Sequence, residues 1–115
     1  MAKPWRLTRQ AEASLIAIAR WTYETFGPRQ GRAYEDDLVA RCQAIAAGGA
    51  PSQACRQVID PDLPEDLRFT RAGQHLVVFV EDPDRLIVVD FLHARSGLPR
   101  RLRALADPKA EGDGL

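Results

Sequence analysis

Apolar residues in the first half of the chain recur at the spacing of two amphipathic helices. Between residues 9 and 26 one face carries Ala11, Leu15, Ile18, Ala19, Thr22 and Phe26, which is the period of an α-helix. Gly27 and Pro28 end this helix, because glycine adopts a left-handed cap and proline does not continue a helix. From about Arg29 a second stripe carries Tyr34, Leu38, Cys42 and Ile45. The pattern predicts two antiparallel helices that form a hairpin.

Elsewhere the hydrophobic pattern has the period of β-strands. Residues 5–8 alternate and predict a first strand. Residues 48–66, with their prolines, glycines and acids, are interpreted as a long surface connection without regular structure. Three further strands follow, with turns at Gly73 and at residues 82–84; they span 67–72, 75–80 and 86–93. The short turns predict a three-stranded antiparallel meander.

The C-terminal segment predicts a short helix with an apolar and a basic side. Leu98, Leu102 and Leu105 share one face of this helix, and residues 107–115 are expected to form a flexible tail. The predicted fold class is α+β, in one domain over residues 1–106: an N-terminal strand, a helix hairpin, the meander and the C-terminal helix. We expect the helices to pack on one side of an antiparallel sheet of four strands.

Composition narrows the class of protein. The chain has 115 residues, enough for one domain, with 45% hydrophobic and 28% charged residues, which argues against disorder. No apolar run is long enough to cross a membrane, and the N-terminal residues lack the apolar core of a signal peptide, so we expect a cytoplasmic protein. Cys42 and Cys55 show no metal-binding spacing and are interpreted as packing residues. No metal or cofactor is expected.

Charge is balanced overall but uneven along the chain. Sixteen Lys and Arg residues offset sixteen Asp and Glu residues, which argues against nucleic-acid binding through the overall field. Both ends are locally basic: Lys3, Arg6 and Arg9 near the start, and Arg95, Arg100, Arg101 and Arg103 near the end. Such a segment is either a solvated surface or one cationic face that binds a partner.

Motifs for catalysis are sparse. The chain has no GxGxxG, P-loop, HExxH or GxSxG sequence. Its two histidines, His75 and His93, each fall at the edge of a predicted strand, and nothing places a serine on a strained turn. The residues therefore give weak support to an enzyme.

The order of the motifs is more informative. Residues 67–79 read LRFTRAGQHLVVF and residues 86–95 read LIVVDFLHAR. In this segment, and in the RLT and AEASL runs of the first half, the chain resembles the RelE/ParE superfamily of toxins from bacterial type II toxin–antitoxin pairs. The resemblance spans roughly residues 4–105. The AAGG run at 46–49 and the basic C-terminal helix resemble the ParE branch in particular.

The branch decides the function that the resemblance implies. A RelE-like toxin is a ribosome-dependent mRNA endonuclease, for which the candidate catalytic residues are Arg68, Arg71, His75 and His93. Phe79 stands where a hydroxyl would serve that chemistry better, and no tyrosine follows Tyr34. A ParE-like toxin inhibits DNA gyrase by binding and needs no catalytic set, which fits this sequence better. A non-toxic binding module of the same fold is the third alternative.

The ParE resemblance also implies partners and contact residues. A cognate ParD-like antitoxin is expected to contact exposed apolar residues, for which the candidates are Trp5, Trp21 and Leu98. DNA would be contacted only through the antitoxin or gyrase, and no membrane is involved. The candidate gyrase-binding residues are the basic ones at the end of the last strand and beyond it: His93, Arg95, Arg100, Arg101 and Arg103.

Overall fold

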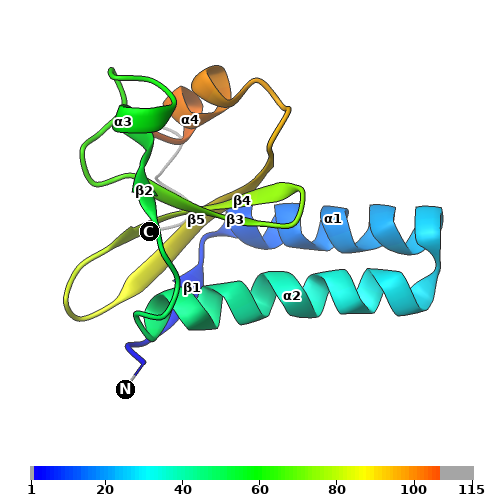
Figure 1. Cartoon of the computed structure of the whole chain (residues 1–115). Helices are drawn as coiled ribbons and strands as arrows, with labels where there is room; N and C mark the ends of the chain where they lie inside the picture. The colour runs from blue at the N-terminus through cyan, green and yellow to red at the C-terminus, as the bar shows by residue number, and fades with distance from the viewer. Residues whose placement is uncertain (1, 107–115) are drawn as a thin grey trace.

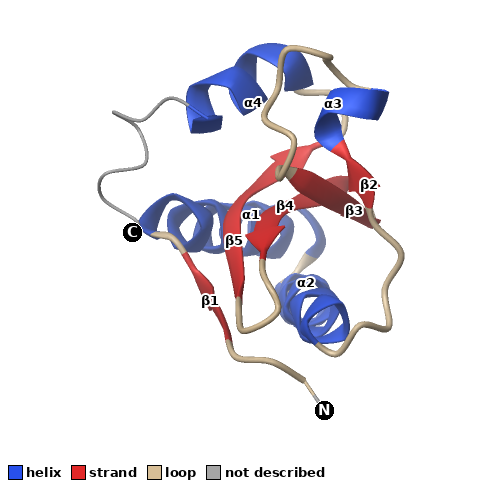
Figure 2. Ribbon diagram, turned by 90° about the vertical axis from the view of Figure 1, so that its left-hand side faces the viewer, coloured by secondary structure: helices blue, strands red, loops and turns tan. Residues whose placement is uncertain are grey.

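The computed structural model describes residues 2–106, arranged as a sheet between two groups of helices (Figures 1 and 2). The expected tail at 107–115 lies outside the described residues. In chain order the elements are β1 (Trp5–Leu7), α1 (Arg9–Phe26), α2 (Pro28–Ala46), β2 (Gln53–Ala54), α3 (Cys55–Val58), β3 (Arg68–Ala72), β4 (His75–Glu81), β5 (Leu86–His93) and α4 (Leu98–Ala106).

The helix hairpin is confirmed. The Thr8 side chain accepts a hydrogen bond from the Ala11 backbone N–H and caps α1. Gly27, at a φ of 98°, ends α1, and Pro28 begins α2 at a position where a missing N–H costs nothing. Gly31 lets the helices cross closely, because a Cβ there would lie 2.9 Å from the Cα of Tyr23. Figure 1 shows that the tip of the hairpin extends past the edge of the sheet.

Within residues 2–106 the sheet has five strands, in the order β1-β5-β4-β3-β2, one more than the four expected, because Gln53–Ala54 pair with β3. The antiparallel meander β3-β4-β5 is confirmed. The expectation of an entirely antiparallel sheet was wrong, because β1 pairs parallel to β5, with Trp5 opposite Leu86 and Leu7 opposite Val88. This pairing joins segments about eighty positions apart, and no local pattern specifies its direction.

Residues 48–66 also differ from the expectation of an irregular connection. They contain the short strand β2, which pairs with β3, and the single-turn helix α3. Cys55 and Leu63 of this segment are buried. The segment covers apolar side chains of the sheet, and this burial outweighs its content of turn-forming residues.

Each face of the sheet has its own core. The core under α1 and α2 includes Leu38, Val77 and Phe79. The core on the opposite face lies under α3 and α4 and includes Val78 and Leu102. The expectation that all helices pack on one side was therefore wrong: α4 covers the second face (Figure 2). The strands β4 and β5 are apolar on both faces, so each face needs a cover.

Candidate functional site

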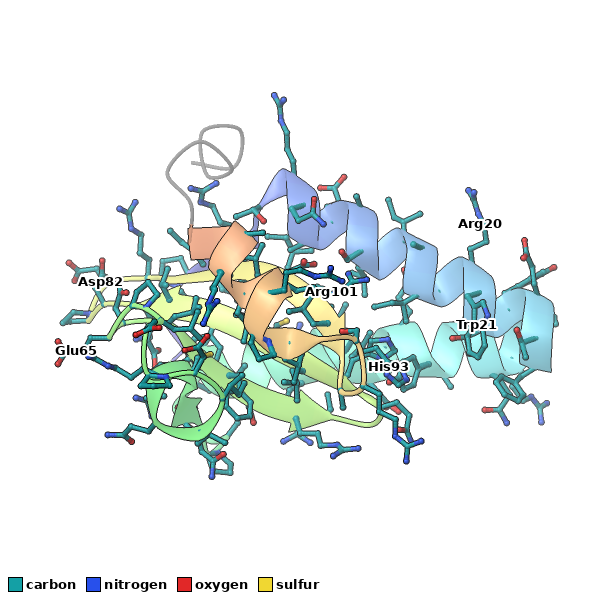
Figure 3. All side chains as sticks on the ribbon, turned by 90° about the horizontal axis from the view of Figure 1, so that it is seen from above. Arg20, Trp21, Glu65, Asp82, His93 and Arg101 are labelled. Atoms are coloured by element: carbon teal, nitrogen blue, oxygen red, sulfur yellow. The ribbon has the colours of Figure 1, made fainter. Side chains whose placement is uncertain are left out.

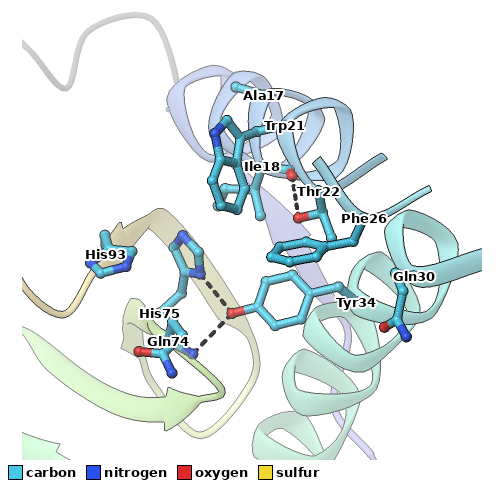
Figure 4. A pocket seen from close by; sticks show the side chains of 10 residues that line it. All are labelled: Ala17, Ile18, Trp21, Thr22, Phe26, Gln30, Tyr34, Gln74, His75 and His93. Atoms are coloured by element: carbon cyan, nitrogen blue, oxygen red, sulfur yellow. Dashed lines mark hydrogen bonds between the residues drawn. The ribbon is translucent and has the colours of Figure 1, made fainter. Parts of the chain in front are cut away.

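A groove lies between the tip of the helix hairpin and the adjoining end of the sheet (Figure 4). Its volume is about 680 Å³, which is in the range of ligand-binding sites. The walls are mainly apolar, and the side chains of Trp21 and Phe26 are each 60% exposed. Their rings meet edge to face at 5.8 Å. The lining residues are Ala17, Ile18, Trp21, Thr22, Phe26, Gln30, Tyr34, Gln74, His75 and His93.

The polar end of the groove is built around the hydroxyl of Tyr34. This hydroxyl lies 2.7 Å from Nδ1 of His75 and accepts a hydrogen bond from the Gln74 backbone N–H at 3.0 Å. Gly73 makes the approach possible, because a Cβ there would lie 2.8 Å from Tyr34 Oη. Gly73 therefore has two effects: it forms the turn between β3 and β4, and it leaves room for the ring of Tyr34.

His75 and His93 face each other across β4 and β5. They are paired in register, and their rings meet edge to face with centroids 5.2 Å apart. Burial and, to a smaller extent, the neighbouring His93 lower the pKa of His75 from 6.5 to about 4. His75 is therefore neutral near pH 7 and has lost most of its capacity as a general acid.

The four residues considered for RNA cleavage do not form one site. His75 and His93 are in contact, but Arg68 begins β3, four positions before Ala72, or about 13 Å along the strand. The Arg68 guanidinium donates to the hydroxyl and the carbonyl oxygen of Ser52, so it ties β3 to the preceding loop. Arg71 is exposed and donates to the Gly73 carbonyl oxygen.

The basic residues of the C-terminal segment differ in their surroundings. Arg95 and Arg100 are exposed. Arg101 extends from α4 toward α1 (Figure 3) and donates through Nε to the carbonyl oxygen of Ser96. Arg103 forms an ion pair with Asp60 at 2.6 Å and a longer one at 3.7 Å with a second acid of that loop. Arg103 thus fastens α4 to the segment after α3.

A buried carboxylate lies beneath this basic segment. Asp90 accepts a hydrogen bond from Ser14 Oγ at 2.5 Å and one from the Phe91 backbone N–H. Burial raises the pKa of Asp90, and the charge of Arg101 acts in the opposite direction. The pairing with β4 shifts at this point, from Val78 opposite Asp90 to Phe79 opposite Val88, so Val89 is the extra residue of a β-bulge in β5.

The three apolar candidates for antitoxin contact lie in different surroundings. Trp21 is exposed, as expected, and forms one wall of the groove. Trp5 packs against the core under α1 and α2, whereas Leu98 packs against the core on the opposite face. The structure does not bring these three side chains together.

Four groove residues belong to the apolar stripes that the sequence pattern predicts for the two helices: Ile18, Thr22, Phe26 and Tyr34. Phe26 and Tyr34 continue the apolar spacing of their helices, so the pattern assigned them to the core. Phe26 is the last residue of α1, at the tip of the hairpin, and the Tyr34 hydroxyl accepts from the Gln74 N–H in the turn between β3 and β4, so both side chains line the groove. Only the hydroxyl of Tyr34 distinguished it from the other stripe residues.

The described part of the chain gives little support to metal binding, to thiol chemistry or to a membrane-spanning helix. Within residues 2–106 no cluster of three His, Cys, Asp or Glu side chains is arranged to hold a metal ion. Burial raises the pKa of Cys42 to about 12 and that of Cys55 to about 11, so both thiols are unreactive near pH 7. No helix in the same residues combines the length and apolar character needed to cross a membrane.

Fold and groove together define a small α+β protein with an exposed aromatic groove. Over residues 5–97 the chain matches the family model described as the ParE toxin of the type II toxin–antitoxin system parDE. The chain belongs to this family. Among solved structures it is similar to one titled "Chromosomal ParDE TA system from P. aeruginosa", with a TM-score of 0.60 and 18% identity, covering 80% of this chain and 96% of that one. A comparison with curated proteins finds no match.

Proposed function

We propose that this type II toxin arrests growth in the cytoplasm by binding DNA gyrase, and that a cognate ParD-like antitoxin neutralises it. The observation that supports binding over RNA cleavage is the separation of Arg68 from the other three candidate nuclease residues, together with the state of His75. Arg68 is engaged with Ser52 at the far end of β3, and His75 is neutral and hydrogen-bonded to Tyr34. Inhibition by binding needs a surface and no acid–base pair.

The basic segment at the end of β5 is the proposed contact with gyrase. His93, Arg95, Arg100 and Arg101 are exposed there, the last two as consecutive residues of α4. A cationic surface raises the rate of association with an acidic partner or with DNA held by gyrase, and makes that rate depend on salt. Arg103 contributes indirectly, because its ion pair with Asp60 holds α4 in place.

The antitoxin is proposed to contact the hairpin side of the toxin at Trp21. A large exposed aromatic side chain beside an apolar groove is the kind of anchor that protein interfaces use. Trp5 and Leu98 are proposed as secondary contacts at most, because each is already packed against a core.

Supercoiling assays with purified gyrase test the proposed target. The variant is Arg100→Glu combined with Arg101→Gln, which removes the basic charge without placing a new negative charge beside Asp90. The matched control is Arg29→Glu combined with Arg32→Gln, the same change at two exposed positions of α2. We expect the α4 variant to need about tenfold more protein for half-maximal inhibition, and the control to act like the wild type.

Other outcomes of this experiment contradict the proposal. If wild-type toxin leaves supercoiling unchanged and cleaves ribosome-bound mRNA, the gyrase assignment is wrong. If both double variants inhibit gyrase as well as the wild type, with folding confirmed by circular dichroism, the contact with gyrase lies away from α4.

A further inference from the structure

The hydrogen bonds at the polar end of the groove fix where the protons of both histidines lie. The backbone N–H of Arg95 donates to Nδ1 of His93 at 3.1 Å. A nitrogen that accepts a hydrogen bond carries no proton, so the neutral ring of His93 carries its proton on Nε2.

The same conclusion follows for His75 from the geometry around Tyr34. The tyrosine hydroxyl accepts from the Gln74 N–H, and it has one proton of its own to donate. Its two possible acceptors are His75 Nδ1 at 2.7 Å and the Ala72 carbonyl oxygen at 3.4 Å. Only the shorter separation is typical of a hydroxyl donor, so Tyr34 donates to Nδ1 and the proton of His75 lies on Nε2.

The groove therefore offers two Nε2–H donors at one end. Within residues 2–106 no hydrogen bond engages Nε2 of either histidine. Figure 4 shows the two rings at one end of the groove and Phe26 with Gln30 at the other. His93 is exposed and His75 is partly buried, and among the described residues neither Nε2 is a buried atom without a partner, so an acceptor on an occupant of the groove can reach both donors.

Charge around this end favours an anionic acceptor. None of the groove-lining residues is acidic. Arg95 follows His93 by two positions, and Arg71 is bonded to the turn that carries Gln74. A carboxylate would meet two N–H donors and nearby positive charge, whereas a cation would meet neither a carboxylate nor a free lone pair on the histidines.

The rest of the groove is mainly apolar and favours an apolar group on the molecule that occupies it. Trp21 and Phe26 form an aromatic wall that is open to solvent, and Ile18 lies beside them. A polypeptide segment fits these features, because it presents an apolar and an acidic side chain from one continuous backbone along an open groove. An amphipathic helix offers such a pair at a spacing of three or four residues.

We propose that this groove binds a segment of the antitoxin in which an apolar side chain packs against Trp21 and Phe26 and an aspartate or glutamate accepts hydrogen bonds from Nε2–H of His75 and His93. The proposal rests on the proposed function, since it assumes an antitoxin partner. The histidines select the acidic residue, and the aromatic wall supplies the apolar contact.

The test measures binding of the full-length toxin to the purified protein encoded beside its gene, by isothermal titration calorimetry at pH 7.5. His93→Gln retains an N–H at the position of Nε2, whereas His93→Asn retains only a group at the position of Nδ1. We expect the Asn variant to weaken binding by about 10- to 100-fold, the effect of losing a hydrogen bond to a charged group. The Gln variant should stay within about threefold of the wild type.

A second pair of variants tests the aromatic wall. Trp21→Ala removes one of the two aromatic residues of the wall, and Tyr23→Ala removes a similarly exposed aromatic residue of α1 that does not line the groove. We expect the Trp21 variant to lose at least tenfold in affinity and the Tyr23 variant to bind like the wild type. Circular dichroism and urea unfolding confirm that each variant is folded.

The outcomes separate this inference from the proposed function. If wild-type toxin does not bind the neighbouring gene product, the toxin–antitoxin function itself fails and the groove proposal fails with it. If the wild type binds and all four variants bind equally well, the antitoxin uses another surface and only the groove proposal is overturned. Nitrogen-15 NMR of free toxin provides an independent check, since a proton on Nδ1 of either histidine would contradict the donor assignment.

Discussion

Acidification tests the environment assigned to His75. The pKa of this residue is lowered from 6.5 to about 4 by burial and by His93. Between these two values the unfolded chain binds a proton on His75 that the folded chain does not take up. Stability is therefore complete above pH 6.5 and falls as the pH decreases toward 4.

The size of this loss follows from the pKa difference. A difference from 6.5 to about 4 corresponds to about 3 kcal/mol for a fully buried group, at 1.36 kcal/mol for each pKa unit. His75 is only partly buried, and solvent screens its interactions. We therefore expect about half of that value, on the order of 1–2 kcal/mol, to be lost between pH 7 and pH 4.5.

This pH-dependent loss of stability is measured by urea unfolding of the wild type and of His75→Gln, each at pH 7 and at pH 4.5. The Gln variant removes the titrating ring, and contributions from the carboxylates are common to both proteins and cancel in the comparison. The wild type should lose on the order of 1–2 kcal/mol more than the variant on acidification. Equal losses in both proteins would show that the ring of His75 is solvated in the folded state, and the argument from burial would be wrong.

Two further predictions concern positions that hold the site in place. Gly73→Ala should destabilise the fold by about 2 kcal/mol in urea unfolding, because it combines a left-handed φ of 62° with a Cβ 2.8 Å from the ring of Tyr34. The control is Gly48→Ala, which has open space around it and should lose only about 1 kcal/mol. Equal losses in the two variants would argue against the close approach of the tyrosine. Arg103→Ala should accelerate hydrogen exchange of the α4 amides, whereas Arg100→Ala should leave it unchanged, because only Arg103 is paired with Asp60. Unchanged exchange in both variants would mean that the apolar contacts of α4 are enough to hold the helix in place.

Local signals in the sequence specify the elements of this protein. Helix spacing, the stop at Gly27 and Pro28, and the alternating strands around the Gly73 turn act over a few residues, so the hairpin and the meander could be predicted from them. The exposure of Trp21 followed from its position opposite the buried stripe of its helix. Order and spacing of these signals also indicated the family.

The tertiary structure decided what these elements build together. The parallel pairing of β1 with β5 joins distant segments, and α4 packs on the second face because two apolar strands needed cover on both sides. The groove lies where the tip of the hairpin projects past the edge of the sheet, a relative placement that no single segment encodes. Tyr34 contacts His75, and His75 contacts His93, so this series of contacts spans about sixty positions of the chain. The sequence determines which residues carry the chemistry, and packing determines which of them meet.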